Sequence, residues 1–261
     1  MLFRSLRIVF PARTATLELL ERCLEDSKHS ADPKCVFVGG RSGVGKSSLI
    51  ESFVADHPRV RGEEVDHVPV LVASIPAAST RKAAASSLLV ALGDMNAFSG
   101  DLAKLSHRLQ WYLKRCGVEM VILDEFQHLI DSDSSKVISK TADWIKTLLI
   151  EVRIPFALVG MPEAVQIFDA NPQLSRRFTR RTLIEPLTWA RGDAPSDLRM
   201  LLTMVDKGLP FAVLAGLDHP ETVAWFYRHT KGILGLVMAI VREAAEFAID
   251  RGSNRLEKED L

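Results

Sequence analysis

Apolar residues along this chain follow two patterns that alternate from the N-terminus to about residue 190. Short continuous apolar runs are typical of strands buried on both faces of a parallel sheet, whereas apolar positions three or four residues apart predict helices that bury one face. The runs predict five strands, at residues 35–38, 67–75, 120–123, 155–160 and 182–187. Because helical segments separate these runs, the pattern predicts an α/β fold with a five-stranded parallel sheet.

The pattern changes at residues 191–195, which are rich in Gly, Pro and Asp and are typical of a linker. Only helical spacing follows, which predicts a small all-helical domain with helices at residues 196–205, 220–229 and 233–250. We therefore expect an N-terminal arm and helix at residues 1–30, an α/β domain at 31–190 and a helical domain at 191–261. Arg4, Arg7 and Arg13 give the N-terminal region positive charge, and the arm either packs across the core or contacts a partner or DNA.

A glycine-rich loop separates the first strand from the helix that follows it. Residues 40–47 read G-x-x-x-x-G-K-S, the Walker A pattern, in the strand–loop–helix context that makes this pattern specific. We expect Gly40, Gly43 and Gly45 to adopt positive φ, so that backbone N–H groups can approach a phosphate. Lys46 would reach the β- and γ-phosphates of ATP, and the Ser47 hydroxyl would bind Mg²⁺. The predicted nucleotide-binding residues are Gly40, Arg41, Ser42, Gly43, Val44, Gly45, Lys46, Ser47 and Ser48. A glycine-rich turn that binds nothing is the alternative.

A second motif ends the third predicted strand, where four apolar residues precede Asp124 and Glu125. This is the form of a Walker B strand. Asp124 would hold Mg²⁺ through a water molecule, and Glu125 would orient and polarise the water that attacks the phosphate. The motif is weak alone, but it lies some 80 residues after a phosphate loop with one strand predicted between them.

Arginines concentrate in residues 175–181, which we expect to form a loop before the fifth strand. The guanidinium group contacts phosphate oxygens through two parallel hydrogen bonds, so Arg176 or Arg177 could reach the γ-phosphate bound by a neighbouring subunit. The pattern does not distinguish these two residues, and a solvated basic turn is the alternative.

Composition narrows the class of protein. The 261 residues carry 33 basic and 33 acidic side chains, so the overall charge does not predict nucleic-acid binding and any basic surface must be local. Three widely spaced cysteines form no C-x-x-C pair and fit a reducing compartment. Because the longest apolar run, residues 233–241, is too short to span a bilayer and the start lacks a signal sequence, we expect a cytoplasmic protein.

Taken together, these motifs resemble the AAA+ ATPases, in which an α/β phosphate-loop domain is followed by a helical lid. Residues 40–47, 123–125 and 175–178 match the Walker A, Walker B and arginine-finger segments of that family. Within it, the chain looks like the transposition regulators TniB and TnsC, because of the short N-terminal helix, residues 159–164 and 171–174, and the small lid.

The resemblance implies a magnesium-dependent ATPase, slow and stimulated by assembly, whose subunits form a ring or a helical filament on double-stranded DNA. Such proteins recruit and stimulate a transposase, often with a TniQ-type targeting protein, and ATP hydrolysis dismantles the filament. Their DNA contacts lie on loops that follow the second strand. The candidate contacts in this chain are therefore Thr80, Arg81 and Lys82, with Ser99 as a further one.

Two positions depart from the family pattern. The fourth strand ends at Gly160 without a polar sensor side chain, and Gly235 stands where many lids supply an arginine, for which Lys231 is the candidate substitute. A weak grip on the γ-phosphate favours a slow switch over a motor. Two other functions stay open: an AAA+ ATPase that acts on a protein partner in signalling or secretion, and a phosphate-loop kinase for a small molecule.

Overall fold

The computed structural model describes residues 11–28, 30, 32–130, 135–192 and 195–261. The internal contacts divide these residues into two units, which we describe separately. The α/β unit contains residues 12–41 and 46–184, and the helical unit contains residues 185–261 together with the short segment 42–45. The expected N-terminal arm and two residues of the expected linker, 193 and 194, lie outside the described part of the chain.

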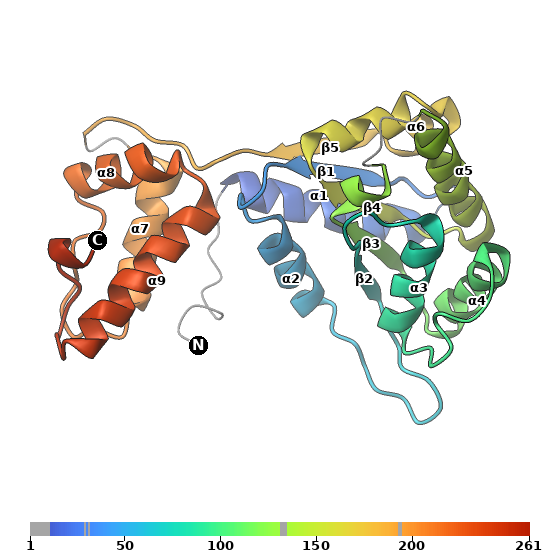
Figure 1. Ribbon diagram of the computed structural model, residues 1–261, viewed down its shortest axis with the longest axis horizontal. Helices are drawn as coiled ribbons and strands as arrows, with labels where there is room; N and C mark the ends of the chain where they lie inside the picture. Colours follow the sequence, from blue (N-terminus) through green and yellow to red (C-terminus); the bar gives the residue numbers. More distant parts are fainter. Residues whose placement is uncertain (1–10, 29, 31, 131–134, 193–194) are drawn as a thin grey trace. The chain divides into compact units, whose positions relative to one another are not determined.

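The α/β unit contains a sheet of five parallel strands, as the sequence predicts, in the order β2-β3-β4-β1-β5 (Figure 1). The strands are β1 (Val36–Gly40), β2 (Val70–Ser74), β3 (Met120–Asp124), β4 (Phe156–Gly160) and β5 (Arg180–Ile184). The helices of this unit are α1 (Pro11–Lys28), α2 (Lys46–Asp56), α3 (Arg81–Leu92), α4 (Leu102–Arg115), α5 (Ser135–Val152) and α6 (Pro172–Arg177), with 3-10 turns η1 (Phe126–Leu129) and η2 (Pro162–Phe168). β4 lies between β3 and β1, and this order places the ends of the three strands side by side.

Both faces of the sheet are buried, which explains why the strands read as continuous apolar runs. On β3, Met120 and Ile122 pack toward α1 and α2, whereas Val121 and Leu123 pack toward α3, α4 and α5. All four side chains are fully buried, and burial of one such side chain stabilises the fold by about 1.5–3 kcal/mol. The central strands are therefore held from both sides, which fixes the position of the polar residues at their ends.

Several element boundaries differ from the expectation. The first helix begins at Pro11, because proline fits the first turn, where its missing N–H is not needed. The segment expected to be a loop before the fifth strand contains a short helix, α6, because the Asn171 carboxamide oxygen accepts hydrogen bonds from the N–H groups of Gln173 and Leu174 at 3.1 and 3.0 Å. Arg180, which we expected in a loop, begins β5.

The helical unit contains α7 (Asp197–Gly208), α8 (Pro220–Thr230) and α9 (Leu234–Asp250), followed by the 3-10 turn η3 (Lys258–Asp260). These helices enclose a separate apolar core that includes Leu202, Phe226 and Val241. The buried carboxylate of Asp206 accepts hydrogen bonds from three successive backbone N–H groups, those of residues 215–217, at 2.9, 2.8 and 3.1 Å. This side chain therefore fixes the connection between α7 and α8. Within the described residues, no helix is long and apolar enough to cross a membrane.

Candidate nucleotide-binding site

The carboxyl ends of β3, β4 and β1 meet at one edge of the sheet, where ligands of open parallel sheets bind. The pairing of Gly39 with Gly160, and of Leu123 with Leu158, aligns the three ends. The phosphate-loop sequence follows β1, and Asp124 and Glu125 close β3. The two motifs that the sequence singled out therefore lie at the same edge.

The phosphate loop uses two of its three glycines for positive φ. Gly43 has φ +78° and Gly45 has φ +101°, backbone conformations that residues with a side chain rarely adopt. The expectation of positive φ is wrong for Gly40, because that residue is still paired with Ile184 as the last residue of β1. The loop thus turns only after the strand has ended.

Lys46, at the start of α2, points back into the loop. Its ammonium group donates hydrogen bonds to the carbonyl oxygens of Gly40, at 2.8 Å, and Arg41, at 3.1 Å, and the residue is only 5% exposed. A buried ammonium group needs such partners. The loop therefore holds the cation next to the position where backbone N–H groups at the start of α2 would meet a phosphate.

Ser47 of the Walker A sequence and Asp124 of the Walker B sequence lie in contact. The Ser47 hydroxyl donates a hydrogen bond of 3.0 Å to Oδ2 of Asp124. Burial raises the pKa of Asp124 above its ordinary value, and the hydrogen bonds from the Glu125 N–H and the Ser47 hydroxyl oppose this shift. The carboxylate is thus poorly solvated, and a cation beside it would relieve the cost of its charge.

This pair of oxygens suits Mg²⁺. The ion prefers oxygen ligands, which a hydroxyl and a carboxylate supply. The Ser47 hydroxyl donates its hydrogen to Asp124, so its lone pairs stay available to the ion, and Asp124 would hold the ion through a water molecule. The described residues contain no cluster of three or more His, Cys, Asp or Glu side chains that could hold a metal, so the remaining ligands would come from phosphate and water.

Glu125 follows directly, in an unusual backbone conformation. Its φ of 54° and ψ of 36° lie in the left-handed region, and its N–H donates to Oδ1 of Asp124 at 2.9 Å. The side chain is 36% exposed, and the ring of His128 lies 4.0 Å from its carboxylate. Left-handed conformations of non-glycine residues are sparse and cluster at functional sites. The chain turns here, so that Asp124 and Glu125 each present a carboxylate at the same strand end.

Two polar side chains at this edge were not predicted. Arg13 of α1 donates hydrogen bonds to the Ser48 carbonyl oxygen at 2.6 Å and to its hydroxyl at 3.2 Å. Gln127 of η1 donates to the carboxylate of Glu125 and accepts from the N–H of Met161 at 3.0 Å. Sequence spacing alone could have flagged Gln127, two residues after Glu125, whereas the contact of Arg13 depends on how α1 packs.

The arginines of residues 176–181 differ sharply in their surroundings. Arg177 pairs with Asp32, and Arg180 pairs with Asp26. Arg181 donates to the Phe178 carbonyl oxygen at 3.0 Å and lies over the ring of Phe168 at 4.3 Å. Arg176 is exposed, and no hydrogen bond or ion pair joins its side chain to another described residue. Three of the four side chains are therefore held within their own chain.

The four candidate DNA contacts lie at the two ends of α3: Thr80, Arg81 and Lys82 where the helix begins after β2, and Ser99 in the connection from α3 to α4. Thr80 caps the helix, because its hydroxyl accepts a hydrogen bond from the Ala83 N–H at 3.2 Å. Arg81 donates to the Lys140 carbonyl oxygen at 3.5 Å, and Lys82 and Ser99 are exposed. No acidic side chain occurs in the first turn of α3, so this end of the helix combines the cations with its unpaired N–H groups.

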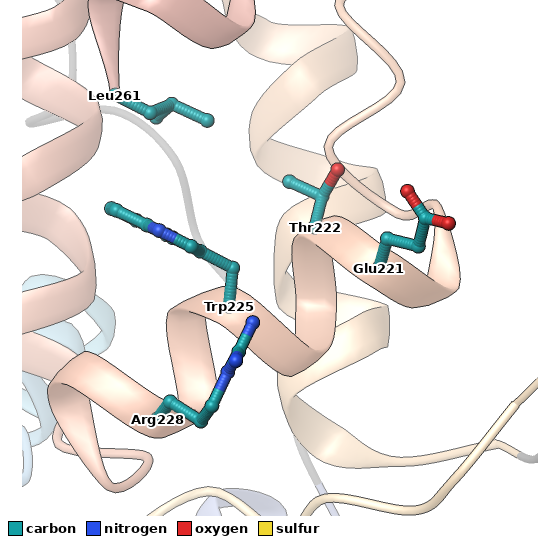
Figure 2. Close-up of a pocket in the computed structure, with 5 residues that line it drawn as sticks. All are labelled: Glu221, Thr222, Trp225, Arg228 and Leu261. Atoms are coloured by element: carbon teal, nitrogen blue, oxygen red, sulfur yellow. The ribbon is translucent and has the colours of Figure 1, made fainter.

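A pocket of about 280 Å³ in the helical unit is lined by residues of α8 and the chain end (Figure 2). The labelled side chains are Glu221, Thr222, Trp225, Arg228 and Leu261. None of the residues predicted to bind nucleotide or DNA lines it. Lys231, the proposed substitute for a lid arginine, instead ends α8 in a left-handed conformation with φ 52°.

The parallel sheet, with a phosphate loop after β1 and a Walker B strand end two positions away, defines an α/β P-loop fold of the AAA+ class. The sequence model of the family described as "Bacterial TniB protein" matches residues 4–187. The chain therefore belongs to the TniB family, and the resemblance found in its motifs is confirmed. No curated protein is significantly similar to it in sequence.

Several solved structures share this fold. The Aeropyrum pernix ORC1 protein, solved in complex with DNA, is 20% identical, with a TM-score of 0.65 over 97% of this chain and 64% of that one. The Aeropyrum pernix ORC2 protein, with ADPNP and ADP, is 18% identical, with a TM-score of 0.66 over 98% of this chain and 69% of that one. AMPPCP-bound DnaA from Aquifex aeolicus is 13% identical, with a TM-score of 0.54 over 94% and 64%. This chain thus spans about two thirds of their lengths, and at such identities the likeness shows the fold.

Proposed function

We propose that this protein is an ATP-dependent regulator of transposition, which assembles on target duplex DNA, recruits and activates a transposase, and disassembles when ATP is hydrolysed. The observation that carries the proposal is the meeting of Lys46, the Ser47–Asp124 pair and Glu125 at one sheet edge. Membership in the TniB family supports the role in transposition. The same resemblance implies a TniQ-type targeting protein as a partner, and the sparse, unpaired cysteines favour a location in the cytoplasm.

The residues divide the chemistry of ATP hydrolysis among them. Lys46 exchanges its carbonyl partners for the β- and γ-phosphates, and the N–H groups of residues 40–48 surround the phosphate chain. Ser47 and Asp124 would hold Mg²⁺, whose charge would neutralise the negative charge that develops on the phosphates. Glu125 orients the attacking water and accepts its proton. The helical unit acts as the lid, in which Lys231 takes the place of the absent arginine.

Arg176 is the better candidate for the residue that reaches the γ-phosphate of a neighbouring subunit. The side chain of an arginine that acts in trans must reach another subunit. Among these four arginines, only Arg176 has no side-chain partner in the described residues, so it breaks no contact when it does so. Arg177 keeps a structural role through Asp32. This assignment requires a ring or filament in which α6 of one subunit faces the phosphate loop of the next.

The cations at the start of α3 support DNA binding. Arg81 and Lys82 lie where the helix dipole makes further positive charge unfavourable, and a phosphate backbone would compensate for that cost. The ORC1 protein, which has a similar fold, is solved in complex with DNA, and this supports DNA as a ligand of this chain. A protein partner is the second candidate, because the net charge is zero and Met95 and Phe98 are largely exposed.

The test measures ATP turnover and duplex binding together. We expect Lys46→Ala to abolish ATP binding, and Glu125→Gln to bind ATP, hydrolyse it at least about 10²-fold more slowly and stay on DNA longer. Lys104→Ala, an exposed lysine on α4, is the matched control for loss of a positive charge. DNA affinity should fall steeply with salt concentration, because phosphate contacts release counterions. Normal hydrolysis by Glu125→Gln would show that the role assigned to Glu125 is wrong. Failure of the protein to bind DNA at any salt concentration would favour the protein partner.

A further inference from the structure

The end of β4 offers no polar side chain of its own, since the strand ends at Gly160 and Met161 follows. A side chain of η1, the turn that follows β3, occupies this place instead. Gln127 accepts a hydrogen bond from the Met161 N–H at 3.0 Å and donates one to a carboxylate oxygen of Glu125. We propose that Gln127 is a positioning residue for ATP hydrolysis: it holds the Glu125 carboxylate against the end of β4. This inference rests on the role of Glu125 proposed above.

The two partners fix the orientation of the Gln127 amide. A backbone N–H can pair only with the amide oxygen, and an ionised carboxylate can pair only with the amide nitrogen. Both contacts are therefore satisfied by one orientation, and the flipped amide would lose both. The hydrogen bond to Glu125 involves a charged acceptor and is of the stronger kind. Gln127 thus links the N–H of Met161, directly after β4, to Glu125 through a single rigid group.

Gly160 makes room for this arrangement. A Cβ atom at residue 160 would lie 2.5 Å from Oε1 of Gln127 and 3.3 Å from the backbone nitrogens of Phe126 and Gln127. The first distance is far shorter than real contacts allow. Any side chain at residue 160 would therefore displace the Gln127 amide. The missing polar residue on β4 and the presence of Gln127 are two parts of one arrangement.

The position of β4 connects this arrangement to the phosphate loop. β4 lies between β3 and β1, as Figure 1 shows, and Gly160 is paired with Gly39, one residue before the end of β1. The Glu125 side chain is 36% exposed and would otherwise sample several rotamers. Its other polar neighbour, His128, is 4.0 Å away. Holding the carboxylate in one orientation favours attack by a water next to the phosphate loop, because orientation lowers the barrier.

Three variants test the inference. Gln127→Ala removes both contacts, and Gln127→Glu keeps the acceptor for the Met161 N–H but removes the donor to Glu125. Gly160→Ala displaces the amide without changing Gln127. We expect each to lower kcat of the DNA-assembled protein by about tenfold, while KM and ATP affinity stay within about twofold. Gln166→Ala, an exposed glutamine of η2, is the matched control and should retain full kcat.

A second measurement separates positioning from a general effect on folding. If Gln127 acts through Glu125, Gln127→Ala should cause no further loss in a Glu125→Gln background, measured by single turnover with excess protein. The inference would be overturned if the kcat losses of Gln127→Ala and Glu125→Gln multiply in the double variant. It would also be overturned if the loss is confined to KM, or if the kcat loss follows a lowered melting temperature in all three variants. Normal kcat in Gln127→Ala, with Glu125→Gln inactive, would overturn it and leave the proposed function intact. If the wild-type protein hydrolyses no ATP, or Glu125→Gln hydrolyses it normally, the proposed function itself fails.

Discussion

Arg176 and Arg177 are adjacent, yet the structure predicts opposite consequences when each is replaced by alanine. Arg177 is bound to Asp32 of its own chain, with exposed side-chain fractions of 21% and 61%. Arg176 is exposed and has no side-chain partner in the described residues. We therefore expect Arg177→Ala to affect the stability of the subunit, and Arg176→Ala to affect hydrolysis only in the assembled state.

The magnitudes separate the two effects. An ion pair as exposed as Arg177–Asp32 contributes about 0.2–1 kcal/mol to the free energy of unfolding. For a chain of this size, 1 kcal/mol corresponds to a change in melting temperature of roughly 2–4 °C, so Arg177→Ala should lower it by no more than about 4 °C. Arg176→Ala removes no contact within the subunit, so its melting temperature should stay unchanged. Loss of an arginine that acts in trans costs about 10³-fold or more in turnover.

Mixing variants provides the decisive assay. Arg176→Ala retains its own Glu125, and Glu125→Gln retains Arg176, so an interface between the two contains one complete site. ATP turnover with saturating duplex DNA should therefore rise well above the sum of the separate variants when they are mixed. When Arg177→Ala is mixed with Glu125→Gln, turnover should not exceed the sum of the separate variants, because Arg177→Ala is already active alone. Absence of the gain, or loss of turnover in Arg177→Ala at an unchanged melting temperature, would refute the assignment.

Two further predictions concern buried ionisable groups. Burial raises the pKa of Asp124 above its unfolded value, so the native state binds the proton more tightly, and stability without metal falls as the pH rises through the native pKa. Asp124→Asn should therefore raise the melting temperature of the metal-free protein at pH 7. The difference should shrink as the pH falls toward 3.8, the ordinary pKa of an aspartate. An unchanged or lowered melting temperature would contradict this prediction. Burial raises the pKa of Cys35 to about 12, which leaves about 10⁻⁴ of the thiol ionised at pH 8. A thiol reagent should react slowly with all three buried cysteines of the native protein and quickly with all three after denaturation, and one fast native thiol would show that a cysteine is accessible.

The sequence predicted the parts of this protein whose signal is local. Five apolar runs correspond to the five strands, although the second is shorter than expected, at Val70–Ser74, and the fifth begins two residues earlier. The glycine loop specifies its own geometry, because its turn at Gly43 and Gly45 needs residues without side chains. The AAA+ fold and the TniB family could therefore be inferred from motifs in their structural context.

Partners from distant segments could not be predicted in this way. The choice between Arg176 and Arg177 depends on Asp32, which is 145 residues away in the sequence and reaches α6 only when the sheet has formed. Likewise, Arg13 was assigned to a charged N-terminal region, and its contact with Ser48 depends on how α1 packs beside α2. Charge pattern identifies which side chains need a partner, whereas the fold decides which partner each one finds.

The end of β4 shows how a departure from a family pattern can be compensated by a neighbouring strand. From the sequence, Gly160 implies a missing polar sensor, whereas the weak grip on the γ-phosphate is expected from the lid, where Gly235 stands in place of an arginine. In the fold, the left-handed conformation of Glu125 turns the chain after β3, so that Gln127 lies over Gly160 and contacts the backbone of β4. A polar group is therefore present at this position, supplied by η1, which follows β3, instead of by β4. If hydrolysis is slow, we expect the cause to lie in the helical unit or in assembly, because Gln127 takes the place of the polar group that β4 lacks.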